Sequence, residues 1–177
     1  MRPVRYNVAA SLDGFIAGPD GEYDWIPDDP TVDFAALFAR VDTVLLGRVS
    51  YELTQNTGGG WPAGSRRYVF SRTLRASDHP DVTVVADDAA GVVGQLRAEP
   101  GDGEIWLYGG GRLFAALLAA GQVDRVEVSV VPVLLGRGVP LHPVVGGAGR
   151  AALALRDTRT YPSGIVTLTY GVPGARR

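Results

Sequence analysis

Glycine, arginine and hydroxyl side chains recur where β-rich segments of this sequence end, and together they suit the binding of an anion. Three glycines, Gly109–Gly111, follow the apolar run Ile105–Tyr108 and lead directly into a helical apolar pattern that begins at Arg112. Glycine permits a tight turn and lets a phosphate approach the backbone with no Cβ in the way. The N-terminus of a helix adds free N–H groups and a partial positive charge. The pattern indicates a phosphate-binding turn, with a purely structural tight turn as the alternative.

Two other β-rich segments end in the same residue types. The run Thr43–Gly47 is followed by Arg48 and Ser50, and the run Arg67–Ser71 is followed by Arg72. An arginine can bind a phosphate through two parallel hydrogen bonds. Each arginine taken alone is more simply interpreted as a solvated surface residue. Three such joints in one chain favour a site for a dinucleotide with an extra phosphate.

The triple glycine differs from the Rossmann dinucleotide fingerprint. The sixth position counted from Gly109 is Phe114 instead of glycine, and no acidic residue stands at the spacing expected for a ribose 2′-hydroxyl. A second triple glycine, Gly58–Gly60, precedes Trp61-Pro62 with no helical pattern after it, and we interpret it as a flexible loop. Only the first triple glycine, Gly109–Gly111, is therefore followed by a helical pattern whose N-terminus could bind an anion.

Composition excludes several other chemistries. The chain has no cysteine and two histidines, so thiolate catalysis and the common metal motifs are excluded and we expect no metal site. All 17 basic residues are arginine, which excludes Schiff-base and lysine-base chemistry. A net charge of −2 without like-charged blocks argues against nucleic-acid and membrane partners. Without a signal-peptide core or an apolar run of membrane-spanning length, we expect a cytoplasmic protein.

The elements that position these residues alternate between strand and helix, which predicts one α/β domain over residues 1–177 with three layers and a mostly parallel mixed sheet. The turn TYPSG, residues 160–164, predicts an antiparallel C-terminal edge hairpin. Helical patterns predict helices at Asp33–Arg40, from Arg48 onward, after Asp87 or Asp88, and at Arg112–Ala120. The predicted strands are Val4–Ala10, Phe15–Ala17, Thr43–Gly47, Arg67–Ser71, Val82–Ala86, Ile105–Tyr108, Val126–Val131 and Ile165–Tyr170, with one more after Leu153.

Four segments, in order, carry a resemblance to a known family: VAASLDGFIA, DTVLLGRVSYE, YVFSRTL and IWLYGGGRLFAALLAAGQVDRVEVSVVPVLLGRGVPL. The sequence resembles the dihydrofolate reductase-like superfamily, and most of all its branch with the C-terminal reductase domain of bacterial riboflavin biosynthesis enzymes. The resemblance implies a central mixed sheet flanked by helices, NADPH as hydride donor, a small-molecule substrate and a homodimer. It covers most of the chain, from Val4 to about Leu141.

The resemblance also assigns cofactor contacts. It implies that Gly47, Arg48 and Ser50 lie near the cofactor phosphates and that Ser71 and Arg72 meet the adenosine 2′-phosphate. An acidic ribose ligand would repel that phosphate, so its absence fits NADPH. The remaining implied cofactor-binding residues surround the pyrophosphate and the nicotinamide: Ala10, Ile16, Tyr108, Gly109, Gly110, Gly111, Arg112, Leu113 and Phe114.

The proton donor is the open question. Asp33 stands where folate reductases place a supporting carboxylate, but the spacing differs, Asp28 and Asp29 are rivals, and helix capping is the alternative interpretation. Asp13 lies in the SLDG turn, which the resemblance places facing the substrate, although Asp-Gly also forms turns on its own merits. Trp25 and Phe34 could wall an aromatic substrate pocket or belong to the core.

These observations predict an NADPH-dependent reductase that transfers a hydride to a pterin, a ribosylaminopyrimidine or another small conjugated heterocycle. The protein would supply orientation and electrostatics, and the nicotinamide would supply the hydride. The alternative is an NADP(H)-binding sensor or partner protein without catalysis. It is favoured if no carboxylate reaches the nicotinamide.

Overall fold

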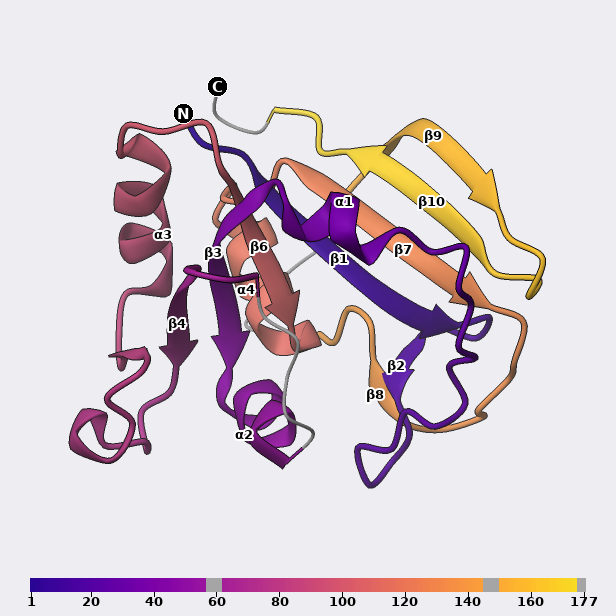
Figure 1. Ribbon diagram of the computed structural model, residues 1–177, viewed down its shortest axis with the longest axis horizontal. Coiled ribbons are helices and arrows are strands. Elements are labelled where there is room, and N and C mark those ends of the chain that lie inside the picture. The colour runs from indigo at the N-terminus through magenta and orange to yellow at the C-terminus, as the bar shows by residue number, and fades with distance from the viewer. Residues whose placement is uncertain (57–61, 145–149, 175–177) are drawn as a thin grey trace.

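The computed structural model describes residues 1–56, 62–144 and 150–174, and the predicted loop at Gly58–Gly60 lies outside them. Its centre is an eight-stranded sheet in the order β5-β4-β3-β6-β1-β7-β10-β9 (Figure 1). The six strands from β5 to β7 are parallel, and β10 pairs antiparallel with both β7 and β9. The predicted α/β class, the mostly parallel sheet and the antiparallel C-terminal hairpin are confirmed.

The strands are β1 (Val4–Ser11), β2 (Phe15–Ala17), β3 (Val41–Gly47), β4 (Arg66–Phe70), β5 (Thr83–Val85), β6 (Glu104–Gly109), β7 (Arg125–Val131), β8 (Val139–Pro140), β9 (Ala154–Thr160) and β10 (Val166–Gly171). The helices are α1 (Phe34–Phe38), α2 (Arg48–Asn56), α3 (Ala89–Ala98) and α4 (Gly111–Ala119), with a 3-10 turn at Ala76–Asp78. In the described residues no helix is both long and apolar enough to cross a membrane.

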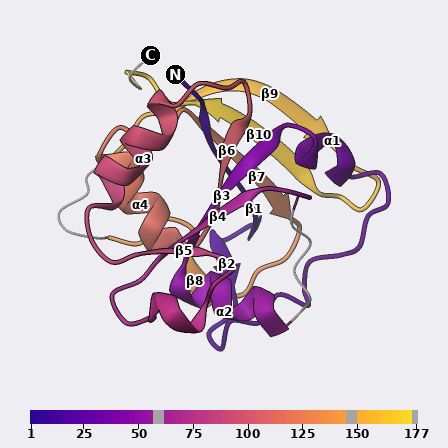
Figure 2. The same cartoon turned by 60° about the vertical axis from the view of Figure 1, so that its left-hand side comes forward.

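Helices cover both faces of the sheet. Seen nearly along the sheet, α3 and α4 lie on one side and α1 on the other (Figure 2). The face toward α3 and α4 carries the larger core, in which Tyr6, Leu107 and Leu117 are almost fully buried. The predicted three-layer arrangement is therefore present.

The alternation of side chains along β6 decides which residues enter the core and which face the other side. Successive residues of a strand point to opposite faces. Ile105 and Leu107 enter the larger core, whereas Trp106 and Tyr108 join a second cluster on the opposite face. The rings of Trp106 and Tyr108 lie 5.1 Å apart, edge to face. This second face leads to the functional site described below.

Two elements differ from the sequence prediction. The helix predicted at Asp33–Arg40 is only Phe34–Phe38: Asp33 is its N-cap and accepts a hydrogen bond from the Ala36 N–H, and Ala39 is its C-cap. Strand β8 was not predicted. It is two residues long and pairs with β2, so it has no periodicity of its own to reveal it.

The long polar loop before α1 is fastened to the C-terminal hairpin through Asp29. The Asp29 carboxylate accepts hydrogen bonds from the N–H and hydroxyl of Thr31, at 2.9 and 2.6 Å, and from the Ser163 N–H at 3.3 Å. Hydrogen bonds from Ser163 and Thr31 lower the pKa of Asp29 to about 2. Asp29, a predicted rival for the proton donor, therefore holds two segments together.

This contact predicts a pH dependence of stability. A depressed folded pKa contributes stability above the unfolded value of 3.8, and that contribution is lost as the pH falls through about 2. We expect Asp29→Asn to lower the free energy of unfolding at pH 7 and to flatten its decline between pH 4 and pH 2. Urea unfolding at several pH values measures both quantities. An unchanged slope in the variant would show that Asp29 does not account for the acid sensitivity.

Candidate functional site

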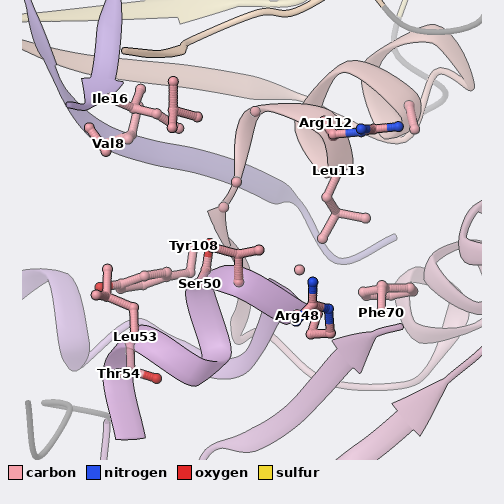
Figure 3. A pocket seen from close by; sticks show the side chains of 18 of the residues that line it. Val8, Ile16, Arg48, Ser50, Leu53, Thr54, Phe70, Tyr108, Arg112 and Leu113 are labelled. Atoms are coloured by element: carbon pink, nitrogen blue, oxygen red, sulfur yellow. The ribbon is translucent and has the colours of Figure 1, made fainter. Parts of the chain in front are cut away.

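A cavity of about 1180 Å³ lies at the carboxyl ends of β3, β4 and β6. Glycine, arginine or serine residues follow each of these three strands, and parallel strands bring their carboxyl ends to one edge of the sheet. The lining includes the predicted cofactor residues Ile16, Gly47, Arg48, Ser50, Ser71, Arg72, Tyr108, Gly109, Gly110, Gly111, Arg112 and Leu113. Figure 3 shows several of them from close by. The convergence on which the phosphate-site prediction depended is present.

The three glycines of the β6–α4 turn serve different purposes. Gly109 has a φ of 146°, which side-chain-bearing residues rarely adopt. A Cβ at Gly111 would lie 2.5 Å from the Pro140 carbonyl oxygen and 2.9 Å from that of Leu141, so packing alone requires glycine there. A Cβ at Gly110 would meet only the Ser50 hydroxyl, at 3.5 Å. Two of the glycines are thus structural, and Gly110 is the one that leaves the cavity edge clear.

The start of α4 is suited to an anion. Gly110 is the N-cap residue and provides no side-chain acceptor for the first N–H groups. The first turn contains no acidic residue, and Arg112 in that turn lines the cavity. Free N–H groups, the positive end of the helix and a guanidinium therefore occur together at the cavity edge.

The other two arginines have weak partners. Arg48, at the start of α2, lies 2.8 Å from Glu52 one turn along the helix, with both side chains nearly half exposed. Arg72 lies 3.3 Å from Asp87, with exposed fractions of 83% and 78%. Exposed pairs of this kind contribute little to stability, at most about 1 kcal/mol. Both guanidinium groups can therefore turn to a phosphate at small cost.

Two serines support these positions. The Ser71 hydroxyl accepts hydrogen bonds from the N–H groups of Thr73 and Leu74, at 3.2 and 3.1 Å, which shapes the turn that carries Arg72. Ser50 lies in the first turn of α2 across from the glycines, and its hydroxyl would be the nearest atom to a Cβ at Gly110. Both serines line the cavity, and Ser71 also shapes the loop that carries Arg72.

Two predicted cofactor contacts have their side chains in the core. Ala10 is 2% exposed and belongs to the larger core. Phe114 is 3% exposed, and its ring stacks on Tyr6 with centroids 4.0 Å apart. Neither is among the described residues that line the cavity. Phe114 holds α4 against the sheet, which positions Arg112 and the glycine turn.

The two predicted proton donors have structural partners. The Asp13 carboxylate accepts hydrogen bonds from the Ser11 hydroxyl, at 2.6 Å, and from the Leu135 and Gly136 N–H groups, at 3.1 and 2.7 Å. The Ser11 hydrogen bond is the main reason that the pKa of Asp13 is lowered. Asp33 caps α1. Neither residue is among the described residues that line the cavity. This favours the structural interpretations, turn formation for Asp13 and helix capping for Asp33.

Sequence reasoning missed an aromatic and apolar part of the lining. Trp106 lines the cavity because it lies on the same face of β6 as Tyr108. The two-residue repeat of a strand could have predicted this from the sequence. Tyr23 and Ile26 come from the long polar loop, where no periodicity marks them. Phe34 lines the cavity, as proposed, but Trp25 does not, and its indole N–H donates to the Glu22 carbonyl. Burial, with a smaller effect of Tyr23, raises the pKa of the Tyr108 phenol.

Comparisons with known proteins agree with this architecture. The chain is 34% identical to uncharacterized protein YyaP of Bacillus subtilis, over 96% of this chain and 95% of that protein. It is similar to the crystal structure of a putative riboflavin biosynthesis protein from Shewanella sp. PV-4, with a TM-score of 0.81, 25% identity and full coverage of both chains. A bifunctional deaminase and 5-amino-6-(5-phosphoribosylamino)uracil reductase from Thermotoga maritima gives a TM-score of 0.69 at 19% identity.

The Thermotoga match covers 97% of this chain and 57% of that chain, so this chain corresponds to part of the longer protein. Residues 2–167 match the family described as the RibD C-terminal domain. The dihydrofolate reductase-like fold, with its mostly parallel mixed sheet, agrees with that match. The chain belongs to the RibD C-terminal domain family.

Proposed function

We propose that this protein is an NADPH-dependent reductase that transfers a hydride to a small conjugated heterocycle. The observation that carries the proposal is the convergence of Arg48, Arg72 and Arg112 with the Gly109–Gly111 turn on one large cavity. A cofactor with a pyrophosphate and a 2′-phosphate needs this combination of bare backbone and guanidinium groups. Members of the family typically use NAD(P)H, which supports the same assignment.

The residues present fit such a cofactor. Arg112 and the N-terminus of α4 would hold the pyrophosphate, Arg48 would support it from α2, and Arg72 would bind the 2′-phosphate. When bound, the nicotinamide supplies the hydride. The apolar side chains of Val8, Ile16 and Leu113 limit water in the interior of the cavity.

The reaction also needs a proton, and Tyr108 is our candidate donor. The carboxylates among the described lining residues are Asp87, paired with Arg72, and Asp88, which caps α3. Both belong to the arginine side of the cavity. Tyr108 lies in the wall on the other side (Figure 3), and a phenol is protonated at neutral pH, the more so here because burial raises the pKa of Tyr108 further. The phenol can donate its proton and be reprotonated by water.

We expect Tyr108→Phe to reduce kcat about 100-fold, the lower end of what a positioned acid provides. The Kd for NADPH should stay close to that of the unchanged protein, because the ring remains. Single-turnover oxidation of NADPH measures the step, and fluorescence titration measures the Kd. Tyr161→Phe, which removes a phenol outside the cavity, is the control. An unchanged kcat in Tyr108→Phe would assign the proton to another group or to water.

A titration of the protein with NADPH and NADH tests the proposal directly. We expect saturable binding of NADPH, weaker binding of NADH, and oxidation of NADPH with at least one pterin, pyrimidine or flavin. Failure to bind either cofactor would overturn the proposal. The rival function, a binding protein without catalysis, is favoured by one observation: neither Asp13 nor Asp33 lines the cavity. Tight NADPH binding with no oxidation across the panel would establish that rival.

We also propose that the protein is a homodimer, as the family resemblance implies. Strand β9 forms one edge of the sheet, and most of its side chains are exposed. An exposed edge of this kind can pair with another chain. Sedimentation at micromolar concentration that shows only an 18.7 kDa species would remove this proposal.

A further inference from the structure

The charges of the cavity are unevenly distributed. Among the described residues of the lining, the cationic side chains are Arg48, Arg72 and Arg112. In Figure 3 Arg48 and Arg112 lie toward Leu113 and Phe70, whereas Tyr108 and Leu53 lie on the other side of the view. The proposed cofactor occupies the side with the arginines, so its phosphates use the positive charge that the cavity offers.

The other side of the cavity is aromatic. Trp106 and Tyr108 are in edge-to-face contact at 5.1 Å, and Phe38 connects Trp106 to Phe34 through ring distances of 5.9 and 6.3 Å. Tyr23 is close enough to Tyr108 to contribute to its raised pKa. We call Tyr23, Ile26, Phe34, Trp106 and Tyr108 the aromatic end, since all five line the cavity. Such a surface stacks on a flat conjugated ring.

The loop that supplies part of the aromatic end is acidic. Residues 18–33 contain no arginine, lysine or histidine, and they hold six carboxylates: Asp20, Glu22, Asp24, Asp28, Asp29 and Asp33. All of these are exposed except Asp29. The internal segments that the structure does not describe, residues 57–61 and 145–149, contain no charged residue in the sequence. The six carboxylates lie outside the described lining, but their loop supplies Gly21, Tyr23 and Ile26 to it. A phosphate at the aromatic end would therefore approach an acidic loop and find no arginine among the lining residues described there.

We propose that the substrate is a flat conjugated heterocycle without a phosphate group, and that the aromatic end and the acidic loop exclude phosphorylated forms of the same ring. This proposal rests on the proposed reductase function. It separates the protein from the similar Thermotoga maritima protein, whose name specifies a phosphoribosylated pyrimidine. Exclusion operates through like-charge repulsion, which builds specificity against the wrong ligand.

Matched ligand pairs test the proposal on protein saturated with NADP⁺. The pairs are riboflavin with its 5′-phosphate, and 5-amino-6-(ribosylamino)uracil with its 5′-phosphate. Quenching of tryptophan fluorescence or calorimetry gives each Kd. We expect at least one phosphate-free ring to bind, and each phosphorylated partner to bind about tenfold more weakly, with the gap narrowing as salt screens the repulsion. Tighter binding of any phosphorylated partner, or no binding by either phosphate-free ring, would overturn the proposal.

A gain-of-charge variant makes the test independent of the choice of ring. Phe34 is 55% exposed and lines the cavity, so Phe34→Arg adds a guanidinium at the aromatic end without opening the core. We expect the preference to shift about tenfold toward the phosphorylated partner. Leu134→Arg is the control, because Leu134 is 69% exposed and outside the lining. Equal shifts in both variants would show a general charge effect and refute the assigned site.

The NADP⁺ titration keeps the two failures apart. If NADP⁺ does not bind, the reductase proposal fails first. If NADP⁺ binds and phosphorylated rings are preferred, the reductase proposal stands and the inferred substrate class is wrong.

Discussion

Arg72→Ala is expected to raise the Kd for NADPH about 10- to 100-fold while changing that for NADH by less than about twofold. A hydrogen-bonded charge pair with a phosphate contributes about 1.5–3 kcal/mol, and only NADPH carries the phosphate that Arg72 would meet. The present partner of Arg72 is Asp87 at 3.3 Å, and both side chains are largely exposed. A dianionic phosphate can displace so weak a partner with little loss. Fluorescence titration with both cofactors measures the difference.

Two further variants separate this effect from a general loss of positive charge. Arg75→Ala removes an exposed arginine from the same loop but outside the described lining, and it should leave both Kd values nearly unchanged. Asp87→Asn removes the competing carboxylate and should tighten NADPH about threefold. Equal losses of NADPH and NADH affinity in Arg72→Ala would refute the assignment of Arg72 to the 2′-phosphate.

Gly111→Ala and Gly110→Ala are expected to fail in different ways. The methyl group at position 111 would lie 2.5 Å from the Pro140 carbonyl oxygen, and backbone cannot rotate away as a side chain can. Overpacking of this kind lowers the free energy of unfolding by about 1–3 kcal/mol. The loss should be larger than in Gly110→Ala, because residue 111 is buried and begins the helix that carries Leu117 into the core.

Gly110→Ala should keep the fold and lose the cofactor. Its φ of −88° is accessible to alanine, and the nearest atom to the new Cβ is the Ser50 hydroxyl at 3.5 Å. We expect a stability loss below about 1 kcal/mol, typical of replacing a capping glycine, and an NADPH Kd raised about tenfold because the methyl occupies the edge where the pyrophosphate would lie. Urea unfolding and cofactor titration of both variants give the comparison. If Gly110→Ala binds NADPH normally, Gly110 does not serve cofactor binding, and all three glycines of the turn have structural roles only.

The two sides of the cavity suit the two ligands of the proposed reaction. The glycine turn and three arginines would seat a phosphorylated dinucleotide on one side of the cavity, and the aromatic end would stack the acceptor ring on the other. Asp13 and Asp33, which the sequence offered as proton donors, lie outside the described lining, where Asp13 binds the Leu135 and Gly136 N–H groups and Asp33 caps α1. We propose the half-buried Tyr108 as the proton donor in their place.

Much of this was readable in the sequence because it depends on local pattern. Apolar runs predicted β1 and β6, and the glycines and arginines after β3, β4 and β6 predicted an anion-binding site. The meeting of Gly47, Arg72 and Gly110 at one cavity also followed, because parallel strands align their carboxyl ends along one edge. Residue type and short-range periodicity can be read from the sequence because they do not depend on contacts between distant segments.

The tertiary structure decided what depends on distant segments. Gly111 must be glycine because Pro140 and Leu141, about thirty residues on, pack against it. From sequence alone an arginine is expected at the surface, but Arg5 and Arg97 are almost fully buried. Each is paired with a carboxylate, Arg5 with Glu104 at 2.7 Å and Arg97 with Asp124 at 2.8 Å. Distant segments also decide which carboxylates are available to the cavity. The Asp13 carboxylate binds the N–H groups of Leu135 and Gly136, and the Asp29 carboxylate binds the Ser163 N–H. A sequence shows which groups can form hydrogen bonds, but only the folded chain shows which partners lie within reach.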